Sequence, residues 1–130
     1  DMALVMATIA NDGQRPLPRL VLGVGTELKP DPAFHSALDP KNARLVEQVL
    51  VDAYQAGAAG TGLPRTGIAG IAREVDPGIL SAPDHAWFVG YAPTDAPQFA
   101  VAVIVEHAED SWEIAAPIGV RILELAQQPE

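Results

Sequence analysis

Two strand-like runs joined by a proline-containing linker constrain the fold of this chain more than any other feature. The first run is DHAWFVGYAP (84–93) and the second is QFAVAVIVE (98–106). Both are rich in β-branched and aromatic residues and have the length of a strand. The linker PTDAP (93–97) contains two prolines, which end any helix and suit a hairpin loop. The two runs therefore predict an antiparallel hairpin.

The second run is almost continuously apolar, as in a strand that is covered on both faces. We expect it to be central in the sheet, with helices supplying the cover. The C-terminal segment 115–127 is the first candidate for a covering helix. Ile114, Ile118, Ile122 and Leu125 recur at helical spacing. The helix is expected to lie across the strand through the last three of them.

Two further helices are predicted. Residues 2–10 are almost uniformly apolar and precede the stop signal Asn11-Asp12-Gly13, so this helix should be buried. Asp39 and Pro40 supply an N-cap and a first helical residue for a helix that runs to about Ala56 and closes at Gly57. Its apolar residues form two neighbouring stripes, one of Leu45, Val49 and Ala53 and one of Val46, Leu50 and Tyr54.

The remaining segments are less regular. Residues 19–24 form a short strand-like run, and residues 25–38 are expected to be loop. Four glycines between positions 58 and 70 exclude a stable helix there, and a strand is predicted from about Thr66 or Ile68 to Val75, followed by a turn at 76–78. The result is a three-stranded antiparallel meander packed with helices, an α+β fold.

Composition limits the classes of function. The chain has 130 residues, enough for one domain, and a net charge of −9, which argues against a nucleic-acid surface. It has no cysteine, so disulfides, thiolate metal sites and a cysteine nucleophile are excluded. No apolar run is long enough to cross a membrane. The sequence starts at Asp1 without a start methionine, a signal peptide or an anchor, so we expect an excised or processed piece.

Five motifs in order resemble the C-terminal part of the transpeptidase domain of penicillin-binding proteins. They are the helix ending in IANDG (9–13), which is similar to the family's AIANGG; PRLV (18–21); the helix from LDP (38–40) to GTG (60–62); DHAWFVGYAP (84–93); and AAPI (115–118). The resemblance covers nearly the whole chain. It implies that residues 1–130 are one C-terminal segment of a β-lactamase/transpeptidase-like domain.

The resemblance also implies a parent protein that cross-links peptidoglycan stem peptides through an acyl-serine intermediate, outside the cytoplasmic membrane. The family's nucleophile and base lie in Ser-x-x-Lys, and a second motif is Ser-x-Asn. Neither occurs here, because the only serines are Ser36, Ser81 and Ser111, and none has the required neighbours. The chain alone is therefore expected to be inactive, without a catalytic residue, a cofactor or a metal. A non-catalytic scaffold that kept the fold is the alternative.

The family's third motif, Lys-Thr-Gly, lies on the strand that lines the active site, and two alignments remain open for it. In the first, Arg65, Thr66, Gly67 and Ile68 occupy its place, with Arg65 and Thr66 binding the substrate carboxylate and the Ile68 N–H serving as an oxyanion donor. In the second, GIAG (67–70) matches the family's GVAG before the motif. The motif itself is then missing, with IARE (71–74) where it should be.

The other candidate sites are weaker. His35, His85 and His107 are far apart in the sequence and have no metal-ligand spacing, and His85 is expected to be a hydrogen-bonded structural residue. The acids Asp84, Glu106, Glu109 and Asp110 are expected to be solvated. As partners we expect stem peptides and β-lactams, through the complete domain. We also expect self-association, or pairing with the missing half, because a free sheet edge and the apolar helix 2–10 would remain uncovered.

Overall fold

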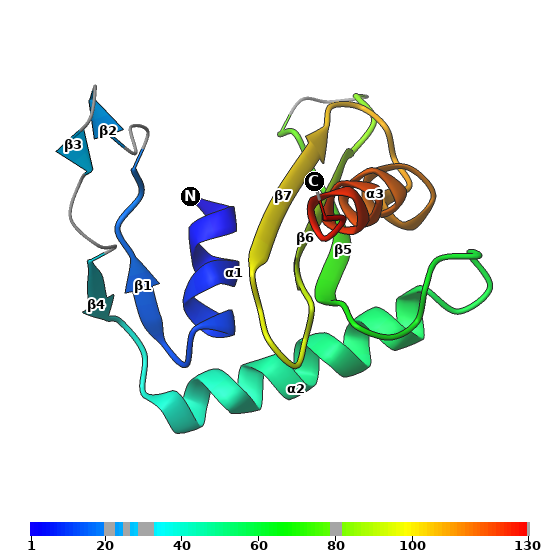
Figure 1. The fold of residues 1–130 in the computed structure, drawn as a ribbon. Helices are drawn as coiled ribbons and strands as arrows, with labels where there is room; N and C mark the ends of the chain where they lie inside the picture. Colours follow the sequence, from blue (N-terminus) through cyan, green and yellow to red (C-terminus); the bar gives the residue numbers. More distant parts are fainter. Residues whose placement is uncertain (20–22, 25–26, 29–32, 79–81, 130) are drawn as a thin grey trace.

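The computed structural model describes residues 1–19, 23–24, 27–28, 33–78 and 82–129. Three α-helices and a three-stranded sheet form its body, with two short strand pairs beside it (Figure 1). The helices are α1 (Met2–Ala10), α2 (Pro40–Gly57) and α3 (Ala116–Ala126), the last preceded by the π-helical turn η1 (Ser111–Ala115). The strands are β1 (Gln14–Pro16), β2 (Gly23–Val24), β3 (Glu27–Leu28), β4 (Phe34–Ser36), β5 (Ala69–Val75), β6 (His85–Ala92) and β7 (Phe99–Val105).

The three-stranded sheet confirms the predicted antiparallel meander and the α+β class. Its order is β5-β6-β7, and the register places Gly70 opposite Gly90 and Phe88 opposite Val103. The predicted central position of β7 is wrong for the part of the chain that the structure describes, because β6 lies in the middle and β7 at the edge. Ile104 of β7 is 47% exposed. The apolar composition of β7 shows only that its side chains suit burial. The position of a strand in the sheet depends on which strands pair with its two edges, and composition does not report that.

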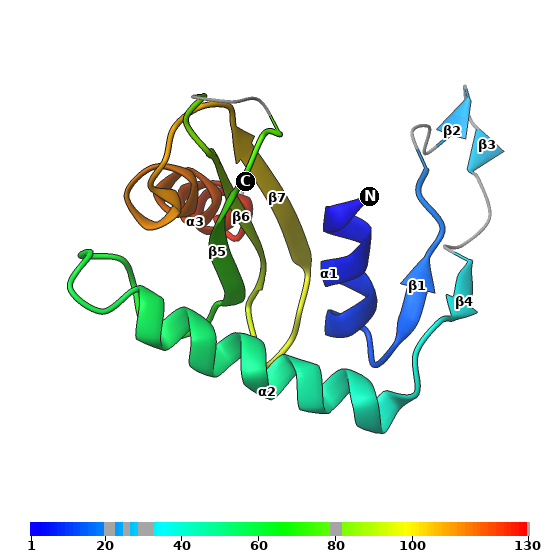
Figure 2. The same ribbon diagram turned by 180° about the vertical axis from the view of Figure 1, so that it is seen from behind.

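The two faces of the sheet have different cover. One face carries Phe88, Ala72 and Val101 and is buried under η1, α3 and Tyr54 of α2. The other face carries Val89 and Tyr91 and packs against Met6 of α1 and Leu50 of α2. Figures 1 and 2 show α1 and α3 on opposite sides of the sheet, with α2 running past one end of it. Trp87 and Phe88 lie in these two different clusters, so these neighbouring side chains point to opposite faces of the sheet.

Helix α3 covers the sheet as predicted, but through other residues. Ile118, Ile122 and Leu125 are exposed, and Ile114 before them is exposed too. The buried residues are Ala116, Gly119, Val120 and Leu123. The physical reason is the size of Phe88, since a Cβ on Gly119 would lie 2.2 Å from Phe88 Cδ1. Gly119 therefore faces the ring, while Val120 and Leu123 pack into the same core cluster and Ile118, Ile122 and Leu125 point away from it.

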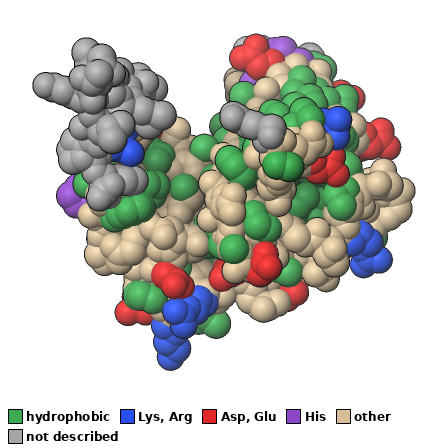
Figure 3. All heavy atoms as spheres, in the orientation of Figure 1, with side chains coloured by type: hydrophobic (Ala, Val, Ile, Leu, Met, Phe, Trp, Pro, Cys, Tyr) green, Lys and Arg blue, Asp and Glu red, His purple; other side chains and the backbone are tan. Residues whose placement is uncertain are grey.

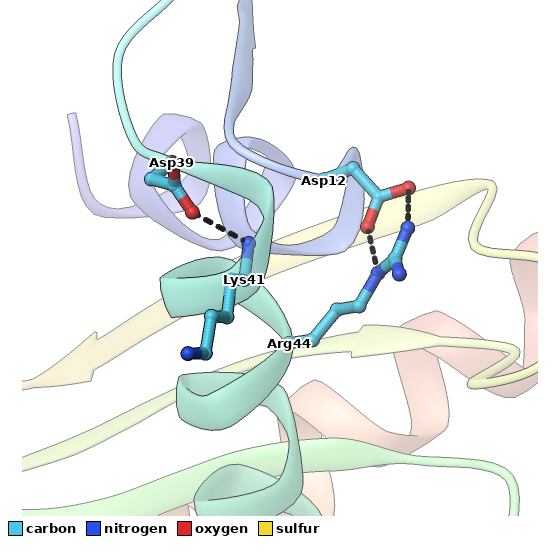
Figure 4. Close-up of polar contacts among 4 residues, drawn as sticks. All are labelled: Asp12, Asp39, Lys41 and Arg44. Carbon is cyan, nitrogen blue, oxygen red and sulfur yellow. Dashed lines mark hydrogen bonds and ion pairs between the residues drawn. The ribbon is translucent and has the colours of Figure 1, made fainter.

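Helix α2 begins as predicted. Asp39 accepts a hydrogen bond at 2.9 Å from the Lys41 N–H, and Pro40 is the first helical residue (Figure 4). Of the second predicted stripe, Leu50 and Tyr54 are buried in the core but Val46 is exposed. Of the first, Leu45 and Val49 are 60% and 65% exposed. The ion pair of Arg44 Nε with Asp12 Oδ1, 2.9 Å long, joins α2 to the turn after α1.

Two expectations for the N-terminal part need correction. Helix α1 has the predicted bounds but is only partly buried, since Met2 and Val5 are exposed. The segment 25–38, expected to be loop, contributes β3 and also β4, which pairs with β1. Its signal is weak because these strands are two and three residues long. Of the predicted run 19–24, positions 20–22 lie outside the described residues, and Gly23–Val24 form β2.

Candidate functional site

The four residues of the first Lys-Thr-Gly alignment lie between α2 and β5. Arg65, Thr66 and Gly67 are exposed, and Gly67 adopts a φ of 81°, which favours glycine. The side chain of Ile68 is buried in the core at 4% exposure, so only its backbone could contact a ligand. The segment therefore presents a cation, a hydroxyl and a glycine at the surface, just before the strand begins at Ala69.

A hydrogen bond fixes the loop that carries these residues. The Tyr54 hydroxyl donates to the Pro64 carbonyl at 2.8 Å. Tyr54 is fully buried, and burial raises its pKa to about 12, so the hydroxyl stays protonated and keeps donating at neutral pH. The bond anchors the loop immediately before Arg65.

The four residues of the second alignment lie within β5. Ala72 is buried, Arg73 is exposed, and Glu74 is committed to a structural contact. A Glu74 carboxylate oxygen accepts a hydrogen bond at 3.1 Å from the backbone N–H of Ser111, and this bond lowers the pKa of Glu74. Glu74 thus ties β5 to the start of η1, a contact that no local sequence pattern predicts because the two residues are 37 positions apart.

The described serines are structural or exposed. Ser111 is fully buried, and its hydroxyl oxygen accepts a hydrogen bond at 3.2 Å from the Trp87 N–H. Ser36 lies exposed on β4, and Ser81 is outside the described residues. Neither described serine has a lysine or a histidine as a hydrogen-bond partner in the contacts observed, so neither shows the geometry of an activated nucleophile.

Two of the three histidines meet, although they are far apart in the sequence. The backbone N–H of His107 donates a hydrogen bond to His85 Nδ1 at 3.1 Å, and the centroids of the two imidazole rings are 4.8 Å apart. His107 Nδ1 lies 3.0 Å from the Pro83 carbonyl, which can only accept. His85 is therefore hydrogen-bonded, as predicted, with His107 as its partner. His35 lies apart on β4.

Two acidic residues near this histidine pair accept hydrogen bonds from backbone N–H groups. Asp110 caps η1, because its carboxylate accepts a hydrogen bond at 2.9 Å from the Glu113 N–H. The backbone of Asp84 accepts another at 3.1 Å from the Glu109 N–H. Within the described ranges, histidines and acids form no group of three or more that could hold a metal ion.

Helix α1 borders three hollows. One of 390 Å³ lies between α1 and the start of α2 and is lined mostly by apolar residues, including Leu4, Val5, Ile9 and Val46. Two others, of 270 and 290 Å³, lie between α1 and β7. In the middle of the face shown in Figure 3, over β7, hydrophobic side chains reach the surface. In the parts of the chain that are described, no helix is both long and apolar enough to span a bilayer.

Comparison with known proteins identifies the family. The profile of the penicillin binding protein transpeptidase domain matches residues 1–124. The peptidoglycan D,D-transpeptidase PbpA of Mycobacterium tuberculosis (strain H37Rv) is 33% identical over 144 aligned residues, which cover 98% of this chain and 29% of that protein. PbpA of Mycolicibacterium smegmatis is 34% identical over 134 residues, or 90% of this chain and 26% of that protein.

Solved structures agree with the sequence relatives. The imipenem acyl-enzyme complex of penicillin-binding protein A from M. tuberculosis matches with a TM-score of 0.83 and 33% identity, over 97% of this chain and 30% of that one. PBP2 of Pseudomonas aeruginosa matches with a TM-score of 0.79 and 29% identity, over 98% and 29% of the two chains. The chain thus spans less than a third of these relatives. It belongs to the penicillin-binding protein transpeptidase domain family.

Proposed function

We propose that this chain is the C-terminal segment of a D,D-transpeptidase domain whose complete form cross-links peptidoglycan stem peptides and is acylated by β-lactams outside the cytoplasmic membrane. The observation that carries the proposal is the family match over residues 1–124, together with relatives named as peptidoglycan D,D-transpeptidases. The acyl-enzyme complexes of the M. tuberculosis protein with imipenem and penicillin G support the β-lactam part.

The chain by itself supplies scaffold and no nucleophile. Acyl transfer needs an activated serine, and Ser-x-x-Lys is absent from these 130 residues. Of the described serines, Ser111 is buried and its hydroxyl is engaged by the Trp87 N–H. The expected result is that incubation of this chain with penicillin G leaves its intact mass unchanged. The M. tuberculosis protein with a penicillin G acyl-enzyme structure is the positive control. A stoichiometric mass increase that survives denaturation would refute this inactivity.

The proposal assigns carboxylate binding to the segment before β5. Arg65 and Thr66 are exposed and adjacent, and a guanidinium beside a hydroxyl can bind the terminal carboxylate of a stem peptide by charge-assisted hydrogen bonds. Gly67 leaves open space around its Cα, so a peptide backbone can approach, and the Ile68 N–H is the next donor along the chain.

A titration with an acyl-D-Ala-D-Ala peptide, followed by amide chemical shifts, tests this assignment. The shifts should concentrate at residues 65–68 and disappear in Arg65→Gln. The control is Arg121→Gln, at another exposed arginine, on α3, which should leave them intact. Shifts that are absent, or that persist in Arg65→Gln, would remove the assignment without touching the family membership.

A second candidate function, a non-catalytic scaffold, is favoured by one observation. Strand β5 carries Ile71, Ala72, Arg73 and Glu74, none of which provides a free hydroxyl, and Glu74 holds η1 instead of a ligand. The sequence encoded upstream of Asp1 discriminates between the two candidates. Ser-x-x-Lys there would support the transpeptidase, and its absence would support the scaffold.

A further inference from the structure

The turn between β7 and η1, residues 106–110, has a strained backbone that contacts with the start of β6 hold in place. His107 and Glu109 adopt φ values of 55° and 60°, in the left-handed region that non-glycine residues rarely occupy. Such a conformation persists where surrounding contacts over-determine it. Two of these contacts come from backbone N–H groups, since that of His107 donates to His85 Nδ1 at 3.1 Å and that of Glu109 donates to the Asp84 carbonyl at 3.1 Å. One of the two acceptors is therefore an imidazole nitrogen, which can take up a proton.

The hydrogen bonds of the two histidines require opposite tautomers of their rings. A backbone N–H can only donate, so His85 Nδ1 carries a lone pair and the proton of the neutral ring lies on Nε2. The Pro83 carbonyl can only accept, so His107 Nδ1, 3.0 Å away, carries the proton of its ring. The His107 ring keeps this bond when its Nε2 takes up a second proton. The His85 ring cannot keep its bond, because a proton on Nδ1 removes the acceptor.

We propose that His85 is an acid-sensitive anchor of the turn 106–110, which the neutral ring holds in place and which protonation of Nδ1 releases. When both rings are charged, the repulsion between two cations with centroids 4.8 Å apart adds to the lost hydrogen bond. Imidazole groups ordinarily change charge between pH 5 and 8, so the release belongs in that range. It ends at η1, because Asp110 caps that element and Glu74 holds Ser111.

The charged groups on the elements around the two histidines are mostly acidic. They are Arg73, Glu74 and Asp76 on β5 and the turn after it, Asp84 before β6, Glu106, Glu109 and Asp110 after β7, Glu113 in η1 and Asp1 before α1. Figure 3 shows histidine and acidic side chains beside one another at this end of the sheet. The carboxylates attract a cationic imidazole and so favour protonation of either ring. Carboxyl groups ordinarily change charge below pH 5, so a release between pH 5 and 8 is caused by the histidines.

Nuclear magnetic resonance of this chain between about pH 8 and pH 5 tests the anchor. At the upper end of the range, the nitrogen chemical shifts of the rings should place the proton on Nε2 of His85 and on Nδ1 of His107. As the pH falls, the backbone amide signals of His107 and Glu109 should shift with the midpoint of the His85 titration. At the lower end, the His107 amide should exchange with solvent roughly tenfold faster than the same amide in His85→Asn at the same pH.

His85→Asn separates the hydrogen bond from its titration, because the asparagine side-chain oxygen can accept in place of Nδ1 and does not titrate. Both amide signals should stay constant over the range in this variant. His107→Asn keeps a donor for the Pro83 carbonyl and tolerates the positive φ, so the pH-dependent shift should persist there. His35→Asn, on β4, is the matched control for removal of a histidine elsewhere and should leave the shift unchanged.

Three results would overturn the proposal. The first is a neutral His85 ring with its proton on Nδ1. The second is an equal pH-dependent shift of the two amides in the native chain and in His85→Asn. The third is a shift that disappears in His107→Asn, which would assign the titration to the other ring.

Discussion

Replacement of Gly119 by alanine should destabilise the chain, although alanine is the better helix former. Gly119 lies inside α3, where a glycine-to-alanine change would by itself stabilise a helix by about 1 kcal/mol. The added Cβ, however, would lie 2.2 Å from Cδ1 and 2.7 Å from Cε1 of Phe88. Either the ring or the helix must move.

The ring of Phe88 has no room to retreat. It is fully buried, and its far end already lies 3.2 Å from where a Cβ on Gly70 would be and 2.9 Å from one on Gly90. Three glycines thus surround one ring, and α3 must shift outward. Overpacking of this kind costs typically 1 to 3 kcal/mol, and an approach of 2.2 Å belongs in the upper half of that range, about 2 to 3 kcal/mol. After the helix-propensity gain of about 1 kcal/mol, the net loss should be about 1 to 2 kcal/mol. That corresponds to a fall in Tm of roughly 3 to 10 °C for a domain of this size.

Thermal unfolding followed by circular dichroism measures this loss, and a double-mutant cycle with Phe88→Leu isolates its cause. Leucine removes part of the ring, so Gly119→Ala should cost clearly less in the Phe88→Leu background than in the native chain. A Gly119→Ala variant whose Tm is unchanged or higher would refute the reasoning. An equal cost in both backgrounds would show that the clash lies elsewhere.

Two other predictions test the faces of the sheet and the tie to η1. Val103→Asp places a charge on the face that packs against the core under α3 and should lower the free energy of unfolding by roughly 3 kcal/mol. Ile104→Asp, on the half-exposed opposite face, should lower it much less. Equal Tm values for the two variants would contradict this assignment of faces. Because the pKa of Glu74 is lowered in the folded chain, its ionised carboxylate stabilises the fold. This stabilisation is fully present above the pKa that Glu74 has in the unfolded chain, and it is lost as the pH falls through its pKa in the folded chain. Glu74→Gln should therefore flatten the fall in stability at acid pH. At neutral pH it should lower the free energy of unfolding by less than about 1 kcal/mol, because the residue is exposed. An unchanged fall at acid pH would show that the contact with Ser111 does not cause the pH dependence.

Local sequence signals predicted most elements of the fold. The N-cap at Asp39, the bounds of α1 and the hairpin of β6 and β7 depend on residues that are neighbours in the sequence, and all three are present. The hydrogen bonds between residues far apart in the sequence could not be predicted in this way. His85 with His107 and Glu74 with Ser111 are 22 and 37 positions apart, and no spacing rule identifies such pairs. The assignment of carboxylate binding to residues 65–68 stays a prediction, which the peptide titration tests.

The wrong predictions about burial share one direction, because each expected more burial than the structure shows. Helical periodicity placed Ile118, Ile122 and Leu125 against the sheet and Leu45 and Val49 on an apolar stripe of α2, and all five are exposed. Apolar periodicity reports the side chains that a sequence has selected for burial, and it does not report which element covers them. The matched structures contain this fold within chains more than three times as long, of which this chain covers about 30%. The exposed apolar residues therefore mark the surfaces where further cover is to be sought.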